Sequence, residues 1–295
     1  WNVEAHIGGA KMKIERKLNA LVLDTETCFK SENANIILEI GWTVGNVLDK
    51  TDIPTSRRYI VADTLFNPEL HWHSQKLSAI HSELSDAPEG LRVNYGNDMR
   101  YIKYMKEAYR LSCLGGEALG EVVLPWARIL DQLNKDLAMS DCIGAYNFPF
   151  DLRAIQTTTK RFHHHAYNNI YKIPHFCLMQ MSANEIVDRW YFKKIDSLTD
   201  EEKILFKSKS GKNLGYSAEI MARYISEDLG YIEMHTAEED SKIEYEIMQY
   251  YFDDKARDDK FFSDYLGNVK SVSWTKIRDG YKNYKQNELF KEVQE

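Results

Sequence analysis

The chain has 295 residues and is 43% hydrophobic and 28% charged, which is typical of a soluble globular protein with one substantial core. No apolar run approaches the roughly 20 residues of a membrane span, and no charged-then-apolar signal segment opens the sequence, so we expect no membrane association. The formal net charge of −7 argues against a protein that coats nucleic acid by bulk attraction, but not against one that binds a nucleic-acid end locally.

Three strands are expected near the start of the chain, after an N-terminal tail at residues 1–17. The run "ALVLD" at 20–24 is continuously apolar, as in a strand covered on both faces. Residues 36–47 and 57–66 have strand-like composition, and turn-forming residues lie between them. The pattern predicts a meander at the start of a mixed sheet.

Helices and strands alternate through the remainder of the chain. Apolar residues at helical spacing predict helices at 74–86, 121–138, 149–162, 181–192, 213–225 and 237–252, and short apolar runs predict strands at 141–147 and 173–180. Such alternation is typical of an α/β layered domain. We assign this domain to residues 18–255, with helical insertions near 85–120 and 190–212, followed by a C-terminal extension at 256–295.

Acidic residues recur where strands end and helices begin. Asp24 and Glu26 are two residues apart on the first strand, so their carboxylates point to the same side. Asp151 follows the 141–147 strand, and Asp240 comes five residues after His235. Each acid taken alone is more simply a solvated side chain, so only their combination points to a site.

The run "HTAEED" gives a local geometric indication. Thr236 and Glu239 form a capping-box pattern that would start a helix at Ala237. His235 would then lie on the loop before this helix and Asp240 in its first turns. A histidine on a loop beside a carboxylate held by a helix suits a general base next to a metal ligand.

Four carboxylates brought together would repel one another unless cations lie between them. Hard oxygen ligands of this kind suit Mg²⁺ or Mn²⁺. Two such ions about 3.5–4 Å apart can bind the attacking and leaving oxygens of a phosphodiester displacement. We therefore expect two divalent metal ions, Mg²⁺ or Mn²⁺, held by this set of acids.

Taken in order, the D-T-E-T run at 24–27, the Asn147–Asp151 pair and the His235–Asp240 pair resemble the three motifs of the DnaQ-like 3′–5′ exonucleases of the DEDDh subgroup. The resemblance covers about residues 18–255. It implies an RNase H-like (exonuclease) mixed β-sheet flanked by helices, two divalent metals and release of nucleoside 5′-monophosphates from a 3′ end. The expected partner is DNA or RNA with a free 3′ end, with a polymerase or another replication or repair protein as a further partner.

The resemblance also assigns roles to single residues. The metal ligands would be Asp24, Glu26, Asp151 and Asp240, and the residue that activates the attacking water would be His235. Thr27 and the pair Ile80–His81 would position the terminal nucleotide, with Ser82 where the family usually has glycine, and Asn147 would support the site. The spacing between motifs is longer than in compact family members, which is why insertions are expected.

Two other functions remain open at this stage. One is a catalytically silent protein that binds nucleic-acid ends or assists a polymerase, and the other is a phosphodiesterase for small substrates on the same fold.

The four cysteines, Cys28, Cys113, Cys142 and Cys177, are widely spaced and form no C-x-x-C pair. This spacing favours free thiols in a reducing cytoplasm over a disulfide framework or a structural zinc site.

Overall fold

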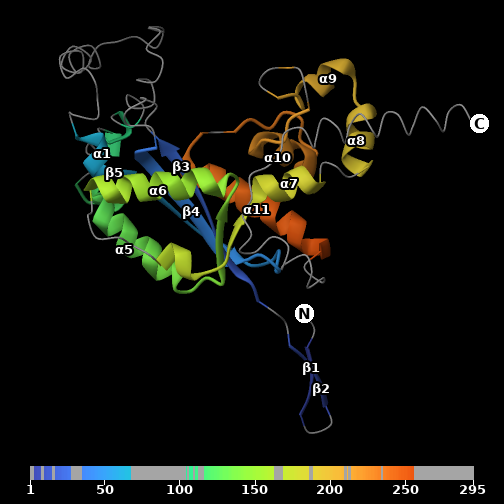
Figure 1. Ribbon diagram of the computed structural model, residues 1–295, viewed down its shortest axis with the longest axis horizontal. Coiled ribbons are helices and arrows are strands. Elements are labelled where there is room, and N and C mark those ends of the chain that lie inside the picture. The colour runs from blue at the N-terminus through green and yellow to red at the C-terminus, as the bar shows by residue number, and fades with distance from the viewer. Residues whose placement is uncertain are drawn as a thin grey trace, which may run out of the picture.

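The computed structural model (Figure 1) describes most of the chain. The described residues are 3–7, 10–14, 17–27, 35–67, 104, 106–108, 110–111, 116–162, 169–185, 189–208, 211, 214–233 and 235–255.

A mixed six-stranded sheet forms the centre of the structure. Its strands are β3 (Asn19–Thr27), β4 (Ile37–Asn46), β5 (Thr55–Val61), β6 (Val123–Leu124), β7 (Cys142–Ala145) and β8 (His175–Cys177), in the spatial order β6-β5-β4-β3-β7-β8. The first three strands are antiparallel neighbours, which confirms the expected meander, and β7 pairs parallel with both β3 and β8. The arrangement is consistent with an RNase H-like sheet.

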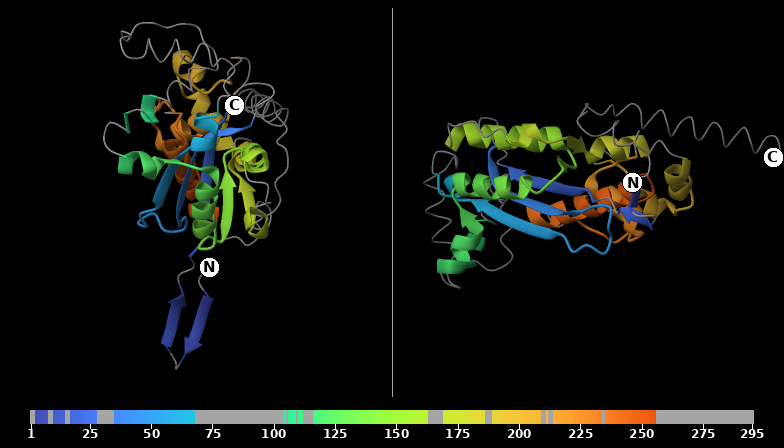
Figure 2. Two further views of the ribbon diagram at one scale, coloured as in Figure 1. Left: turned by 90° about the vertical axis from the view of Figure 1, so that its left-hand side faces the viewer. Right: turned by 90° about the horizontal axis from the view of Figure 1, so that it is seen from below.

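Helices cover both faces of this sheet (Figure 2). The helices whose bounds the structure describes are α1 (Ala62–Leu65), α4 (Gly116–Val122), α5 (Trp126–Leu137), α6 (Phe148–Phe162), α7 (Leu178–Glu185), α8 (Arg189–Asp196), α9 (Asp200–Ile204), α10 (Ala218–Ser226) and α11 (Ala237–Lys255), with a 3₁₀ turn at Asn169–Lys172. Within the tail expected at 1–17, β1 (Val3–Ile7) and β2 (Ala10–Ile14) pair as a separate antiparallel hairpin.

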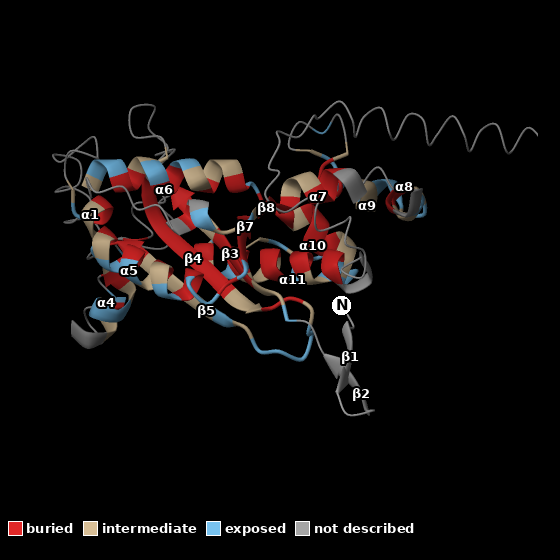
Figure 3. Cartoon of the chain, turned by 60° about the horizontal axis from the view of Figure 1, so that its bottom comes forward, coloured by how far each residue is buried: buried red, intermediate tan, exposed pale blue. Residues whose placement is uncertain are grey.

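The side chains of β3 point alternately to the two faces of the sheet, where they join two separate layers of the core. Leu21 and Leu23 pack with α5 and α6 on one face of the sheet. Ala20 and Val22 pack with α7, α10 and α11 on the other. Both faces of the strand are therefore covered, which explains its continuous apolar sequence and its burial in Figure 3.

Helix α11 lies along β4, and the spacing of every fourth helix residue is close to that of every second strand residue. Two strand residues span about 6.8 Å and four helix residues about 6 Å, so neighbours can recur at these intervals. Three contacts follow these intervals: Gly41 with the backbone of Ala237, the Thr43 hydroxyl with that of Ser241, and Gly45 with the side chain of Tyr245. The Thr43 and Ser241 hydroxyl oxygens are 3.0 Å apart. This register determines which side chains of α11 face the sheet.

Several expected boundaries differ in the structure, among them the start of the helix expected at 121–138, because Val123–Leu124 form β6 and α5 begins at Trp126. The strand expected at 57–66 ends at Val61, because residues 62–65 form the short helix α1. The strand expected at 173–180 comprises only His175–Cys177, and α7 begins directly after it. The helix expected at 181–192 is two helices, α7 and α8. In the two strand cases the apolar pattern is similar for a buried strand and a buried helix, and packing decides between them.

Helix α10 starts five residues later than the start expected at 213, whereas α11 starts at the expected residue. Helix α10 begins at Ala218 after Ser217, whose hydroxyl accepts a hydrogen bond from the Ile220 N–H. Helix α11 begins at Ala237, as the capping-box pattern predicts. Within the described residues no helix combines the length and the apolar character needed to cross a bilayer. Of the four cysteines, Cys142 and Cys177 are buried and free.

Candidate metal centre

The end of β3 directs its polar side chains to both faces of the sheet. Asp24 pairs with Gly41 of β4 and lies on the α11 face, and Glu26, two residues on, is on the same side. Thr25 lies on the opposite side, toward α6. The strand therefore presents two carboxylates to α11, as the spacing predicts.

Asp151 reaches the same strand end from the first turn of α6. Its side chain is buried, and its Oδ1 accepts a hydrogen bond of 2.7 Å from the Thr25 hydroxyl. Burial raises the pKa of Asp151 to about 7, although the bond from Thr25 acts in the opposite direction. Thr25 therefore links Asp151 of α6 to the strand that carries Asp24 and Glu26. The sequence motifs do not reveal this contact.

Asp240 is placed by the close approach of α11 to the sheet. A Cβ atom on Gly41 would lie 2.4 Å from the backbone of Ala237 and Glu238, so only glycine admits the helix at this distance. Gly41 is the cross-strand partner of Asp24, and Asp240 follows in the first turn of α11, where it is buried. The fit between strand and helix therefore brings Asp240 to the Asp24 end of the sheet.

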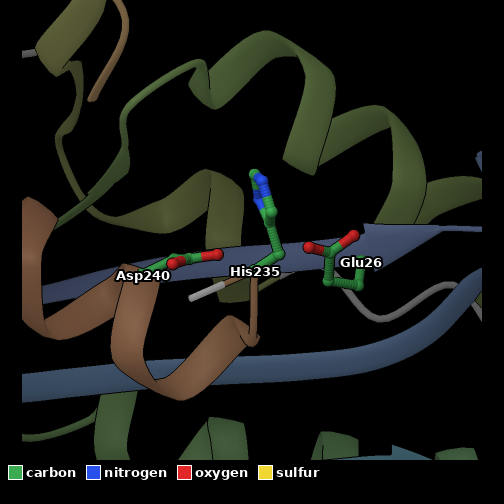
Figure 4. Close-up of side chains that lie close together, drawn as sticks. All are labelled: Glu26, His235 and Asp240. Atoms are coloured by element: carbon green, nitrogen blue, oxygen red, sulfur yellow. The ribbon is translucent and has the colours of Figure 1, made fainter. Parts of the chain in front are cut away.

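Glu26, His235 and Asp240 form a group with the spacing of a metal site. One potential ligand atom from each lies within 4.8 Å of the other two. Figure 4 shows His235 between the two carboxylates. Glu26 and Asp240 are buried and His235 is exposed, so the group has a protected side and a side open to solvent. These three residues could hold a metal ion.

The backbone of His235 has an uncommon conformation. Its φ of 53° lies in the left-handed region, which costs a non-glycine residue about 1–3 kcal/mol. Its side chain is 60% exposed, and its Nδ1 lies 3.6 Å from an oxygen of Glu233. An exposed imidazole on the loop before α11 can exchange a proton with water while it remains beside the acidic group.

The carboxylates also act on one another electrostatically. Burial raises the pKa of Asp24 well above its usual value, and the next largest contributions come, in decreasing order, from Asp151, Asp240, Glu26 and Glu233. These acids come from β3, α6, α11 and the loop before α11. Asp24 therefore interacts electrostatically with the other three acids that the sequence singles out, and of these four acids Glu26 and Asp240 also have the spacing of a metal site.

Two buried acids outside the site, Glu39 of β4 and Asp136 of α5, are neutralised by arginine. Glu39, the cross-strand partner of Glu26, receives a hydrogen bond from Arg58 at 2.5 Å. Asp136 is paired with Arg57 in the same way. By contrast, the largest charge effects on Asp24 come from other carboxylates. This difference is what a site that binds cations requires, because a bound cation would take the place of the arginine.

Glu244 and Glu233 join the acids of the site, and the sequence motifs do not include them. Glu244 is buried, and burial and the charges of Asp24 and Asp151 raise its pKa well above the usual value. Glu233 precedes His235 by two residues and acts on the pKa of Asp24. The signal for Glu244 was its spacing, since it follows Asp240 by one helical turn on the same face.

The structure says less about the remaining expected site residues. Thr27 is buried at the end of β3, where the pairing with β4 shifts its register. Asn147 is exposed, and its carbonyl accepts the Phe150 N–H at the start of α6. Ile80 and His81 lie outside the described residues, as do much of the 85–120 insertion and the 256–295 extension.

Comparison with protein-family models gave no match, and comparison with curated protein sequences gave none either. A functional assignment therefore depends on the geometry and chemistry of the site. The chain is an α/β protein in which carboxylates from separate elements and one exposed histidine gather at the end of β3.

Proposed function

We propose that this protein is a metal-dependent 3′–5′ exonuclease that hydrolyses terminal phosphodiester bonds of DNA or RNA to nucleoside 5′-monophosphates. The observation that carries the proposal is the convergence of Asp24, Glu26, Asp151 and Asp240, whose mutual repulsion divalent cations would relieve. The direction of digestion and the nature of the product rest on the resemblance of the three motifs to the DEDDh exonucleases.

The donor set fits Mg²⁺ or Mn²⁺. All four acids offer hard oxygen ligands, and in the described residues Cys142 and Cys177, which are buried free thiols, are not part of the group. Two divalent ions in such a site lower the pKa of bound water and neutralise charge on the phosphodiester. Asp24, Glu26, Asp151 and Asp240 would hold them.

His235 is the proposed general base. Its imidazole lies beside Glu26 and Asp240 and is open to solvent, so it can take a proton from the attacking water and pass it on. Glu233, 3.6 Å from Nδ1, is placed to stabilise the imidazolium that results. The left-handed backbone of His235, with a φ of 53°, is a strained conformation of the kind that clusters at functional sites, which supports this assignment.

The test is a digestion panel of 5′-labelled single-stranded and double-stranded DNA and RNA with Mg²⁺ or Mn²⁺. The expected result is a ladder that shortens from the 3′ end and stops on addition of a chelator. Asp24→Asn and Asp240→Asn should abolish it. His235→Gly, which suits the positive φ, should fold normally and lose about 10²–10⁴-fold in rate.

The matched control for the aspartate variants is Asp228→Asn, an exposed acid outside the group. It should digest like the unaltered chain. Full activity in Asp24→Asn, or no shortening of any substrate with either metal, would contradict the proposal. Bound but uncut ends would favour an end-binding protein, and cleavage of dinucleotides alone would favour a small-substrate phosphodiesterase.

A further inference from the structure

Glu244 is a buried acid that faces the candidate metal centre. It lies one helical turn after Asp240 on α11, and residues four apart on a helix share a face. It is only 3% exposed, whereas Glu239 and Glu246 of the same helix are exposed. A carboxylate so deeply buried is uncommon in proteins unless it is paired or binds a metal.

The carboxylate of Glu244 connects α11 to the start of α6. Its Oε2 accepts a hydrogen bond of 2.9 Å from the backbone N–H of Tyr146. Tyr146 follows the last residue of β7 and leads into α6, which carries Asp151. One side chain therefore connects the helix that holds Asp240 to the segment that positions Asp151.

Tyr146 is bonded on its other sides as well. Its carbonyl accepts the Met179 N–H at 2.7 Å, and its hydroxyl donates to the Tyr216 carbonyl. The backbone at the end of β7 is therefore held by α7, by the segment before α10 and, through Glu244, by α11. A shift of Glu244 would be transmitted to the first turn of α6.

The charge of Glu244 is opposed by its neighbours. Its largest charge interactions are with Asp24, Asp151 and Asp240, and all three are repulsive. The hydrogen bond from Tyr146 offsets only part of this. A neutral side chain, glutamine, could accept the same hydrogen bond, so the hydrogen bond alone does not account for a carboxylate at this position.

We propose that Glu244 is a positioning residue of the metal centre, which holds Asp151 and Asp240 in register and adds negative charge that strengthens cation binding. The inference rests on the proposed function only in requiring a divalent-cation site at Asp24. Groups that orient metal ligands typically change metal affinity by about 10–100-fold when altered. Glu244 should behave as such a group.

Glu244→Gln separates the two roles, because the amide oxygen keeps the bond from Tyr146 and the charge is lost. Calorimetric titration of the metal-free full chain with Mn²⁺ should show a dissociation constant about tenfold higher than that of the unaltered chain. Without metal, the melting temperature of Glu244→Gln should equal or exceed that of the unaltered chain, since a repulsive charge has been removed. Glu246→Gln, on the exposed side of α11, should match the unaltered chain in both measurements.

Glu244→Asp supplies a second variant that keeps the charge, and its Mn²⁺ affinity should lie closer to that of the unaltered chain. The inference is overturned if Glu244→Gln binds Mn²⁺ as tightly as the unaltered chain, if Glu244→Asp binds it more weakly than Glu244→Gln, or if the unaltered chain binds no Mn²⁺.

Oligonucleotide digestion is scored separately from metal binding. If the unaltered chain binds Mn²⁺ more tightly than Glu244→Gln but digests nothing, the exonuclease proposal fails and the role of Glu244 is supported. If the unaltered chain digests oligonucleotides and Glu244→Gln binds Mn²⁺ equally well, only the role of Glu244 is overturned.

Discussion

Thr25 links two acids that are distant in sequence. It stands between Asp24 and Glu26 on β3 but points to the opposite face, where its hydroxyl donates to Asp151. That bond stabilises the ionised form of Asp151 and lowers its pKa against the effect of burial. The residue between the two acids of the motif therefore helps to orient a third.

Replacing Thr25 with valine should weaken the metal site. Valine has nearly the same shape but no donor, so the pKa of Asp151 should rise above its present value of about 7 and its orientation should loosen. We expect Mn²⁺ affinity at pH 7 to fall about tenfold, measured by calorimetry. Thr25→Ser, which keeps the hydroxyl, is the control and should stay near the unaltered value. Equal affinity in the valine and serine variants would show that the bond is unimportant.

At the scale of elements, the contact of α11 with β4 controls the site. Gly41 allows the helix to approach the strand at the position opposite Asp24, and Thr43 and Gly45 continue the contact along the helix. Because α11 carries both Asp240 and Glu244, its distance from the sheet sets the distance of both acids from Asp24.

Gly41→Ala should therefore damage stability and metal binding together. The added methyl group would meet backbone atoms at 2.4 Å, which cannot rotate away, so α11 must move. Overpacking of this kind costs about 1–3 kcal/mol in the free energy of unfolding, measurable by urea denaturation. Mn²⁺ affinity should fall as well, because Asp240 is displaced.

The matched control is Gly120→Ala in α4, where an added Cβ has no neighbour within 4 Å. Alanine is the better helix former, so this variant should be as stable as the unaltered chain or up to about 1 kcal/mol more stable. If Gly41→Ala were as stable as Gly120→Ala, close packing at Gly41 would not be what places α11.

At the scale of the whole molecule, the acids make stability depend on pH. The pKa values of Asp24, Asp151 and Glu244 are raised in the folded chain, to about 7 for Asp151. Between the unfolded pKa near 3.8 and the folded pKa, the folded chain binds more protons than the unfolded chain. The stabilisation that each group contributes is therefore complete below its unfolded pKa and is lost as the pH rises through its folded pKa, which is about 7 for Asp151.

Without metal, the melting temperature should fall as the pH rises from 5 to 7.5, because the folded chain binds these protons more tightly than the unfolded chain does. A tenfold difference in the proton affinity of one carboxylate between the two states corresponds to about 1.4 kcal/mol in the free energy of unfolding. Mn²⁺ should reverse this trend, because it binds the ionised carboxylates and stabilises more strongly at higher pH. Thermal melts in chelator and in Mn²⁺ at a series of pH values measure both effects. Asp151→Asn should flatten the dependence in chelator, and an unchanged slope in that variant would refute its contribution.

Local spacing was sufficient to predict features that lie within one element. The apolar run of β3, the shared face of Asp24 and Glu26, and the start of α11 at Ala237 depend on strand and helix periodicity and on a capping pattern. The neighbouring boundaries at Val61 and Leu178 differ from expectation, since short apolar runs suit buried strands and buried helices equally.

Relations between elements depended on the tertiary structure. The spacing of Glu244 places it on the same helix face as Asp240, but only the packing of α11 buries that face against the sheet while Glu239 and Glu246 stay exposed. The bond from Thr25 to Asp151 likewise joins residues of separate elements. The sequence alone thus determined which acids lie on which face of each element, because that follows from backbone periodicity. The distances between those acids were decided by long-range packing of α6 and α11 on the sheet, which no local pattern encodes.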